Sequence, residues 1–471
     1  MRSRIGRCVP WRSRLKMDLY LELVSLLGSD VTSQDPVKLE ENSRDKWFAS
    51  HLPEVVVAPT CADQVSRLLR FANEREIPVT ARGAGYGYVG GCVPVKGGIA
   101  LSLARMNRIK EIAVADGVAI VEPGVITGDL QREARNSRLF YPPDPASLKN
   151  SSIGGNIATN AGGPRCLKYG VTRHYVLGLE IVLADGTVVR VGGRTHKNKT
   201  GFDLVGLFVG SEGMLGIVTE ATLRLLPLPP ARASLSASFR SIEDAAATVQ
   251  RILLEGYLPS ALEIADRFTL EAARRHLARR IVPEGEAHLL IDLDGHEGPV
   301  RLLVETLSSL VTSLGALTLE TALGEEACEK LWDLRRGFSE SLKATGLMKL
   351  NEDVTVPRGK LVELMRFAGS LQERYGFPVA CFGHAGDGNI HVNIMVAEPD
   401  SQGVGEKMER ALDDLFRYVI SSGGAITGEH GIGLAKKRWW PQAVSPESIA
   451  LHQTVKRALD PAGILNPGKF L

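Results

Sequence analysis

The pattern of apolar and polar positions predicts a β-α-β start for the ordered part of the chain. Residues 55–57 form an apolar run typical of a buried strand, and apolar residues in 62–75 recur at i, i+3, i+4 and i+7, which predicts a helix. A second short strand at 78–80 leads into a glycine-rich turn. Before this unit, residues 17–28 predict a short amphipathic helix, whereas the polar stretch 31–50 predicts irregular structure.

Further along, the pattern changes from strands to alternating helices and strands. Residues 100–228 are mostly of strand type, with Asp185-Gly186 as a hairpin turn, and a proline cluster at 227–230 marks a domain boundary. The helices predicted after this boundary are 243–255, 264–279, 299–315, 325–345, 358–374 and 404–421. We therefore expect an α+β protein with a basic N-terminal extension and short helix (1–46), a first domain (47–228) and a second domain (229–471).

Composition excludes several classes of protein. Hydrophobic content of 44% and charged content of 23% are ordinary for a globular chain, and a net charge of +2 gives no drive towards nucleic acid. No stretch approaches the ~18 apolar residues of a membrane span. The six cysteines are far apart and form no C-x-x-C pair, which favours a reducing compartment and argues against an iron–sulfur cluster within this chain.

The first 16 residues differ from the rest in charge, because they carry six basic side chains and no acidic one. Such a start is typical of an organellar transit peptide, and it equally fits an over-extended start with Met17 as the initiator. Both interpretations stay open. A transit peptide would direct the protein to an organelle. Otherwise we expect a cytoplasmic protein, or one held at a membrane through a partner.

Three glycine-rich clusters, at 82–91, 151–163 and 210–216, suggest a phosphate site. Glycine lets backbone N–H groups approach an anion closely, and a pyrophosphate would suit such a cradle. The first cluster matches G-x-G-x-x-G, but the residues after Gly91 do not begin a helix easily, so no Rossmann fold is predicted. The alternative is that each cluster is a plain turn.

Longer motifs make the pattern specific. They are V-x-x-P-x-x-x-x-x-V from Val56 to Val65, R-G-x-G at 82–85, DPAS-x4-SIGGNIATNAGG, K-Y-G-V-T-R and V-G-S-E-G-x-L-G-I-V-T-E. Over 45–471 the chain resembles FAD-linked oxidases of the vanillyl-alcohol oxidase type, such as glycolate oxidase flavin subunits and D-lactate or D-2-hydroxyglutarate dehydrogenases. The resemblance implies a two-part FAD-binding domain and an α/β cap domain with an antiparallel sheet, whose last ~45 residues pack back towards the flavin.

The resemblance also implies the FAD contacts. The expected residues are Arg82, Gly83, Ala84, Gly85, Tyr86 and Gly87 at the pyrophosphate; Pro143, Asp144, Ser151, Gly154, Gly155, Asn156, Ala158 and Thr159 at the flavin and ribityl chain; and Glu212, Gly216, Ile217 and Val218 near the adenine. Relatives with covalent flavin place a histidine shortly after R-G-x-G. Here that place is Tyr86, so we expect non-covalent FAD.

A histidine constellation marks the second half. In the segment GHAGDGNIHVNI, strand alternation puts Asn389, His391 and Asn393 on one face, and a glycine turn can fold His384 towards His391. Two imidazoles and a carboxylate commonly hold a catalytic divalent metal, although an isolated histidine is usually structural. The resemblance implies His384, His391 and Glu429 as ligands of Zn²⁺ or a similar ion, His430 as base, and Asn393 as a substrate contact.

The substrate carboxylate needs a cation. Leu331 to Arg336 lie on a predicted helix, and the resemblance implies Arg335 as the carboxylate-binding arginine, since Arg can bind a carboxylate bidentately. The alternative is that Arg335 and Arg336 lie on a solvated helix face. Lys349 and Asn351 lie near further substrate positions of the family.

Together these parts predict an FAD-dependent dehydrogenase of a small D-2-hydroxy acid, of glycolate or D-lactate type, that forms the 2-oxo acid by hydride transfer to flavin. The electrons would pass to an iron–sulfur subunit or another acceptor, and a homodimer stays open. One alternative is an oxidase or transferase variant, alditol-oxidase-like or ether-lipid-synthase-like. Another is a non-redox metal-binding protein whose glycine clusters are only turns.

Overall fold

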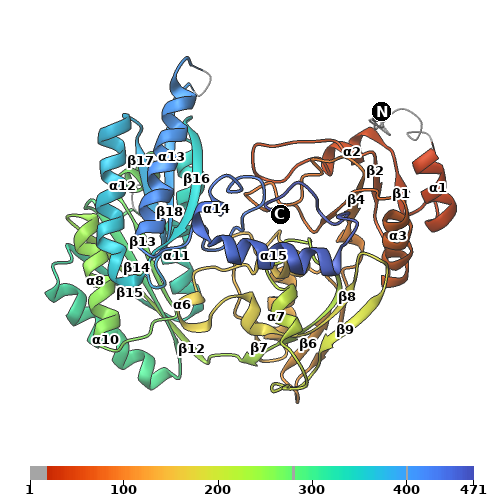
Figure 1. The fold of residues 1–471 in the computed structure, drawn as a ribbon. Coiled ribbons are helices and arrows are strands. Elements are labelled where there is room, and N and C mark those ends of the chain that lie inside the picture. Colours follow the sequence, from red (N-terminus) through yellow and green to blue (C-terminus); the bar gives the residue numbers. More distant parts are fainter. Residues whose placement is uncertain (1–17, 278–281, 399–400) are drawn as a thin grey trace.

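The computed structural model describes residues 18–277, 282–398 and 401–471. The basic segment 1–16 and the last two residues of the predicted helix 264–279 lie outside these ranges. Figure 1 shows two bodies side by side, the first half of the chain from red to yellow-green and the second from green to light blue. The chain passes from one to the other after the prolines at 227–230.

The first half contains two separate sheets. One has the order β1-β2-β4-β3, with β2, β4 and β3 parallel, and the other is antiparallel with the order β5-β6-β10-β8-β9. The strands are β1 (Thr32–Ser33), β2 (Val55–Val57), β3 (Val79–Arg82), β4 (Ile99–Ser102), β5 (Ile109–Ala113), β6 (Val118–Val121), β8 (Val176–Val182), β9 (Val188–Gly192) and β10 (Ile217–Arg224), and β7 (Leu139–Phe140) pairs with β11 (Leu226–Pro227).

Helices fill the space around these sheets. They are α1 (Asp18–Leu27), α2 (Pro36–Glu41), α3 (Ala62–Glu74), α4 (Thr127–Asn136), α5 (Ile153–Thr159), α6 (Cys166–Tyr169) and α7 (Leu204–Phe208). The crossover helix α3 buries Val65, Leu68 and Leu69, the face that the apolar spacing predicts. The predicted β-α-β start, with α3 between β2 and β3, is therefore confirmed.

Two local predictions in the first half are wrong. The stretch 31–50 is not irregular throughout, because β1 and α2 lie within it; Asp35 caps α2 and Pro36 begins it, a common start signal. The stretch 100–228 is not mostly strand, because α4, α5, α6 and α7 lie within it; α5 runs through the cluster 151–163 with Ser152 as its N-cap. Glycine is needed there for close packing, since a Cβ on Gly154 would lie 2.6 Å from the Pro123 Cβ.

The second half is built on one antiparallel sheet of seven strands in the order β15-β12-β14-β13-β17-β18-β16. The strands are β12 (Ala231–Phe239), β13 (Ala261–Ala265), β14 (Ala287–Gly295), β15 (Thr318–Leu323), β16 (Met348–Thr355), β17 (Val379–His384) and β18 (Asn389–Val396). The helices are α8 (Ile242–Leu254), α9 (Arg267–His276), α10 (Glu297–Ser313), α11 (Glu325–Lys343), α12 (Leu361–Tyr375) and α13 (Val404–Ser421).

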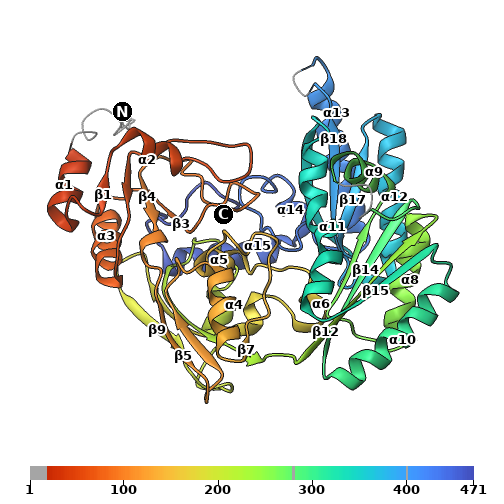
Figure 2. The same ribbon diagram turned by 180° about the vertical axis from the view of Figure 1, so that it is seen from behind.

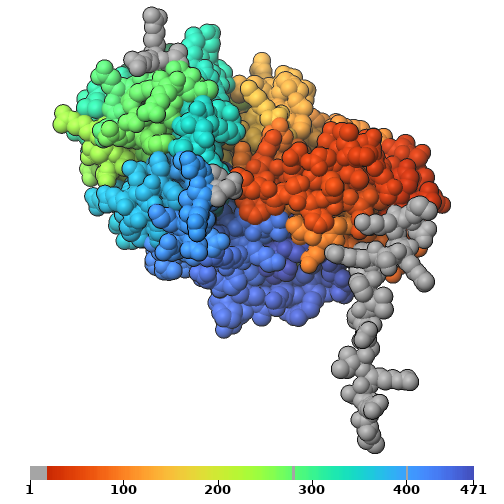
Figure 3. Space-filling view, turned by 90° about the horizontal axis from the view of Figure 1, so that it is seen from above, coloured from red at the N-terminus to blue at the C-terminus, as the bar shows by residue number. Residues whose placement is uncertain are grey.

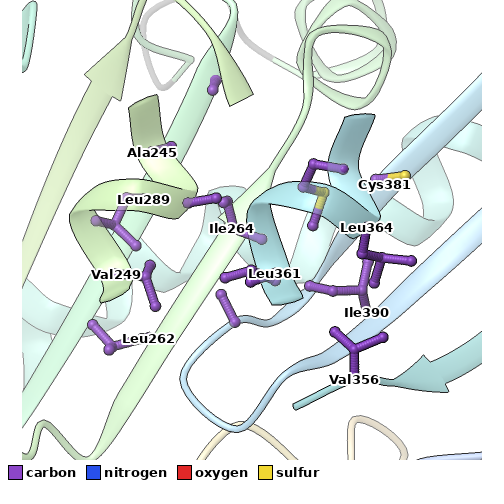
Figure 4. Packing of buried hydrophobic residues seen from close by; sticks show 14 of the residues in the cluster. Ala245, Val249, Leu262, Ile264, Leu289, Val356, Leu361, Leu364, Cys381 and Ile390 are labelled. Carbon is purple, nitrogen blue, oxygen red and sulfur yellow. The ribbon is translucent and has the colours of Figure 1, made fainter. Parts of the chain in front are cut away.

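Helices cover both faces of this sheet (Figure 2). On one face α8, α10, α12 and α13 enclose the largest core; Figure 4 shows Val249 of α8 beside Leu262 and Leu289, and Leu364 of α12 beside Ile390. On the other face α9 and α11 pack through Leu270 and Phe338 on part of the sheet only. The rest of this second face carries polar side chains.

The end of the chain returns to the first half (Figure 3). After α14 (Trp440–Ala443), helix α15 (Pro446–Leu459) packs Val455 and Leu459 against the core of the five-stranded sheet, and Leu465 bridges to Val79 of β3. An α+β fold with a two-part first half and an antiparallel sheet in the second is thus confirmed. No helix in the described ranges is both long and apolar enough to cross a membrane.

Candidate active site

A cavity of about 560 Å³ lies where the two halves meet. All but two of the predicted FAD contacts line it: Arg82, Gly83, Ala84, Gly85, Tyr86, Gly87, Ser151, Gly154, Gly155, Asn156, Ala158, Thr159, Glu212, Gly216, Ile217 and Val218. Three segments distant in sequence therefore form one wall. The volume of the cavity is in the range of cavities that hold cofactors, and the glycine-rich wall exposes backbone to a ligand. The residues present therefore fit FAD.

Pro143 and Asp144 are the two exceptions, because neither is part of this wall. The Asp144 carboxylate accepts the N–H of Arg165 at 3.2 Å, and burial raises the pKa of Asp144 to about 6. The following residues, 145–147, line the cavity instead.

The wall is held together by direct packing of its segments. A Cβ on Gly83 would fall 2.3 Å from the Ser152 Oγ, so the loop after β3 touches the cap of α5. Beside this contact, the Lys46 Nζ lies 4.6 Å from the centre of the Tyr86 ring. The sequence did not indicate that α11, from the other half, also lines the cavity through Arg336, Ser339, Glu340 and Lys343.

Glu429 and His430 also line the cavity, and they connect it to the histidine cluster of the second half. The Glu429 carboxylate lies 3.7 Å from the His384 Nε2, 3.5 Å from the His391 Nε2 and 3.5 Å from the His430 Nε2. His384 ends β17 and His391 lies on the neighbouring β18. The hairpin turn between these strands brings both imidazoles to the polar face of the sheet, as the alternation predicts.

The buried carboxylate of Glu263 on β13 contacts two members of this region, His384 and Arg335. The Glu263 Oε1 lies 2.6 Å from the His384 Nδ1, and its Oε2 accepts the Nε–H of Arg335 at 2.5 Å. Both neighbours are themselves buried. Arg335 therefore does not lie on a solvated helix face; its guanidinium lies 5.0 Å from the ring centre of Phe382. The exposed neighbour is Arg336.

Asp353 on β16 plays the same part for His430. Its Oδ1 lies 3.2 Å from the His430 Nδ1 and binds the buried Lys436 ammonium, while its Oδ2 accepts the N–H of Gly428, Glu429 and His430. The contact at Nδ1 leaves the His430 Nε2 on the side of Glu429 and the cavity.

The pKa values reflect these partners. Burial lowers the pKa of His391 to about 3, so its imidazole is neutral and keeps a lone pair. Burial would also lower the pKa of His384, but Glu263 and Glu429 hold it well above its usual value. Likewise the charge of Asp353 outweighs burial and raises the pKa of His430 to about 9. The cluster thus places positive charge beside Glu429.

These residues also fit a divalent cation. One ligand atom from each of His384, His391 and Glu429 lies within 4.8 Å of the others. Glu263 on the second nitrogen of His384 is the carboxylate–histidine arrangement that orients metal ligands. A cation there would take the place of the His384 Nε2 proton and would oppose the rise in the pKa of His430. Sequence and geometry therefore indicate the same three ligands.

Asn393 lies deeper than the role predicted for it suggests. It is fully buried on β18, its Nδ2 donates to the carbonyls of Ala380 and His391, and it is not part of the cavity wall. Its Oδ1 has no partner among the residues that the structure describes. Nearby, the Lys349 ammonium donates to the Ser339 hydroxyl at 2.9 Å, and burial lowers its pKa to about 8.

Sequence reasoning missed the supporting charges Glu263, Asp353 and Lys436. One signal was present, because Glu263 stands alone in the apolar strand A-L-E-I-A, and an acid in such a place is rarely fully buried unless it is paired. Asp353 and Lys436 lie in mixed segments that gave no such signal.

Comparisons with known proteins show which families the two halves of the chain match. The model of the FAD-linked oxidase C-terminal domain matches residues 228–470, and that of an FAD binding domain matches 53–192. Glycolate oxidase subunit GlcD of Bacillus subtilis is 40% identical over 419 residues, 89% of each chain, and a D-lactate dehydrogenase of Anaerostipes hadrus is 35% identical over 425 residues, again 89% of each. A solved structure of p-cresol methylhydroxylase superposes with a TM-score of 0.78 at 21% identity over 97% of both chains, which shows the shared fold.

Proposed function

Because the chain belongs to the FAD-linked oxidases, we propose that it dehydrogenates a small D-2-hydroxy acid, of glycolate or D-lactate type, to the 2-oxo acid. The observation that carries the proposal is that Glu429 and His430 belong both to the wall of the flavin cavity and to the histidine cluster. A substrate bound at these two residues would contact the proton acceptor His430 at the wall of the cavity that would hold FAD.

The oxidation removes the hydroxyl proton and a hydride from the 2-carbon, and leaves a carbonyl. FAD, when bound in the cavity, supplies the hydride acceptor, and a divalent cation on His384, His391 and Glu429, when bound, supplies a Lewis acid that lowers the pKa of the hydroxyl. The protein's own contribution is to place the substrate and to receive its proton.

His430 is the proton acceptor in this proposal, in its neutral form, which a cation on Glu429 would favour because it opposes the rise in the pKa of His430. The Asp353 carboxylate lies 3.2 Å from the Nδ1 of the ring, and the ring lies between Tyr88, 5.4 Å away, and His391, 5.6 Å away, measured between centres. Its Nε2 therefore keeps one orientation towards the cavity. A general base in such a fixed position contributes roughly 10²–10⁴-fold to rate.

Arg335 is proposed to bind the substrate carboxylate. Its hydrogen bonds within the described ranges use only the Nε, which donates to Glu263, so both terminal nitrogens are left for an anionic ligand. A carboxylate there would be held bidentately beside the cluster. The partly buried Lys349–Ser339 pair adds a second polar group beside α11, where Ser339 lines the cavity.

We further propose that FAD is bound without a covalent link, because Tyr86 stands at the cavity wall where covalent relatives carry histidine. Acid precipitation should then leave the yellow colour in the supernatant, and colour in the pellet would contradict this. Electrons would leave to a separate partner, such as an iron–sulfur subunit, in keeping with relatives that are named as a glycolate oxidase subunit.

Anaerobic flavin bleaching by a panel of D- and L-2-hydroxy acids tests the function. Glycolate or a D-acid such as D-lactate should bleach the flavin and yield one molecule of 2-oxo acid per flavin. The L-acids should not bleach it. Failure of every 2-hydroxy acid to bleach a fully flavinated protein would contradict the proposal. Rapid reoxidation by air would favour the oxidase alternative.

A further inference from the structure

The loop 427–433, which carries Glu429 and His430, is held by side chains through six successive backbone N–H groups. Asp353 accepts those of residues 428–430 at 2.7 to 3.1 Å, and the Thr427 hydroxyl accepts that of Gly431 at 3.1 Å. The N–H groups of Ile432 and Gly433 donate to the two carboxylate oxygens of Glu212, at 2.7 and 2.9 Å. Two buried carboxylates thus hold the two ends of one loop.

These carboxylates come from different halves of the molecule. Asp353 lies on β16 of the seven-stranded sheet, whereas Glu212 lies in the turn before β10 of the first half, in the wall of the flavin cavity. The Glu212 carboxylate accepts hydrogen bonds from this loop, while the residue also lines the cavity. The loop continues along the first half, because Leu434 donates its N–H to the Val89 carbonyl at 2.7 Å.

Glu212 is itself fixed in place. Its φ of +50° is in the left-handed region, a conformation that costs a non-glycine residue about 1 kcal/mol or more and persists only when its surroundings enforce it. The enforcing contacts are the Glu212 N–H bound to the Ala158 carbonyl and its carbonyl bound to the Asn466 side chain. The carboxylate is therefore a rigid acceptor aimed at the loop.

The loop passes directly over this carboxylate. Gly431 has a φ of +86°, and a Cβ at this position would lie 2.7 Å from the Glu212 Oε1. A residue with a side chain at 431 would separate the loop from the carboxylate.

We infer that Glu212 is a positioning residue: it fixes the loop 427–433 to the first half, so that Glu429 and His430 are held at the flavin cavity. Asp353 holds the same two residues at the histidine cluster. The inference rests on the proposed function. Hydrogen bonds to a carboxylate are about twice as strong as neutral ones, so two of them are a substantial tether. Since a misplacement of ~1 Å can cost about 10²-fold in rate, loosening this tether should affect chemistry before substrate binding.

Hydrogen exchange of the FAD-loaded protein tests the tether without any activity assay. In Glu212→Gln one charged acceptor is replaced by a neutral amide, so the amides of Ile432 and Gly433 should exchange roughly tenfold faster. The matched control is Glu220→Gln, the same change on β10, where the carboxylate pairs with Lys110 and Arg190 instead. It should leave exchange in 427–433 unchanged. Gly431→Ala, which disturbs the contact from the loop side, should raise exchange in the same peptide.

Flavin reduction under anaerobic conditions gives the second readout. In Glu212→Gln the limiting rate of reduction by the best acid should fall roughly tenfold to a hundredfold, with the dissociation constant of the acid changed less than about threefold. Unchanged exchange in the loop, in Glu212→Gln or in Gly431→Ala, would overturn the inference, and so would faster exchange with an unchanged rate of reduction. If no acid reduces the wild type, the proposed function fails, whereas the exchange comparison still decides whether Glu212 holds the loop.

Discussion

The wall of the flavin cavity and the histidine cluster beside it are built in opposite ways. Most of the wall comes from three glycine-rich segments, within 82–87, 151–159 and 212–218, that expose backbone to the cavity. The cluster takes one residue each from β13, β16, β17, β18 and α11, and two from the loop 427–433. Short glycine-rich sequence motifs are enough to form a cavity wall that exposes backbone. A group of buried charges needs residues from positions that are distant in the sequence.

Charge explains why the cluster needs so many elements. Buried charges are costly unless each is paired and hydrogen-bonded. Glu263 pairs with His384 and Arg335, and Asp353 pairs with His430 and Lys436. His384, Arg335 and His430 each therefore have a carboxylate partner that acts on neither substrate nor metal. If this contrast holds, substitutions in the cluster should change chemistry and metal content but leave FAD in place.

His391→Ala should have the largest effect. The neutral imidazole of His391 is one of three candidate ligands, so its removal should abolish metal binding and turnover together, with FAD content unchanged. Metal analysis, flavin absorbance and turnover measure the three quantities. His452→Ala, at an exposed position on α15, is the control and should keep all three. Loss of FAD in His391→Ala would break the separation between the two regions.

His430→Asn should lower turnover by roughly 10²–10⁴, the weight of a general base, because Asn cannot take up the proton. Bound metal should stay nearly unchanged, since His384, His391 and Glu429 remain. Steady-state kinetics and metal analysis of the same preparation check both statements. Metal lost here and retained in His391→Ala would mean that ligand and base are exchanged.

Arg335→Lys should weaken substrate binding by ~1.5–3 kcal/mol, because a bidentate contact becomes a single one. That corresponds to a rise in KM of about tenfold to a hundredfold. Arg251→Lys on α8, an exposed arginine outside the cavity that pairs with Glu255, is the matched control and should change KM little. An unchanged KM in Arg335→Lys would leave Arg335 as the partner of Glu263 alone.

Glu263→Gln should have the smallest effect of the four. Gln keeps a hydrogen bond to the His384 Nδ1 but removes the negative charge, so metal affinity should fall roughly tenfold, at the lower end for a residue that supports a ligand. Titration with Zn²⁺ against a competing chelator measures this. Unchanged affinity would show that Glu263 serves only to neutralise Arg335 and His384.

The sequence predicted some elements of the fold and missed others. Periodicity located α3 and the β17–β18 hairpin because each buries one face against its own neighbourhood. It did not predict α2 or α5, whose capping residues Asp35 and Ser152 decide the local structure.

Partners were harder to predict than elements. Glu212 and the loop it binds are 220 positions apart, and a pattern shows which face of an element is polar without showing what meets it. The three candidate metal ligands could be named because they lie in two compact motifs. Their supporting charges could not, since Glu263, Asp353 and Lys436 belong to three separate segments.

Removal of metal followed by anaerobic flavin reduction tests the central claim most directly, because it asks whether the two regions act on one substrate. The FAD-loaded protein would be treated with a chelator, and its flavin reduction by the best 2-hydroxy acid measured before treatment, after it, and after Zn²⁺ is restored. We predict full flavin content throughout, loss of rapid reduction on chelation, and its return with the metal. Undiminished reduction in a protein shown to contain no metal would contradict it.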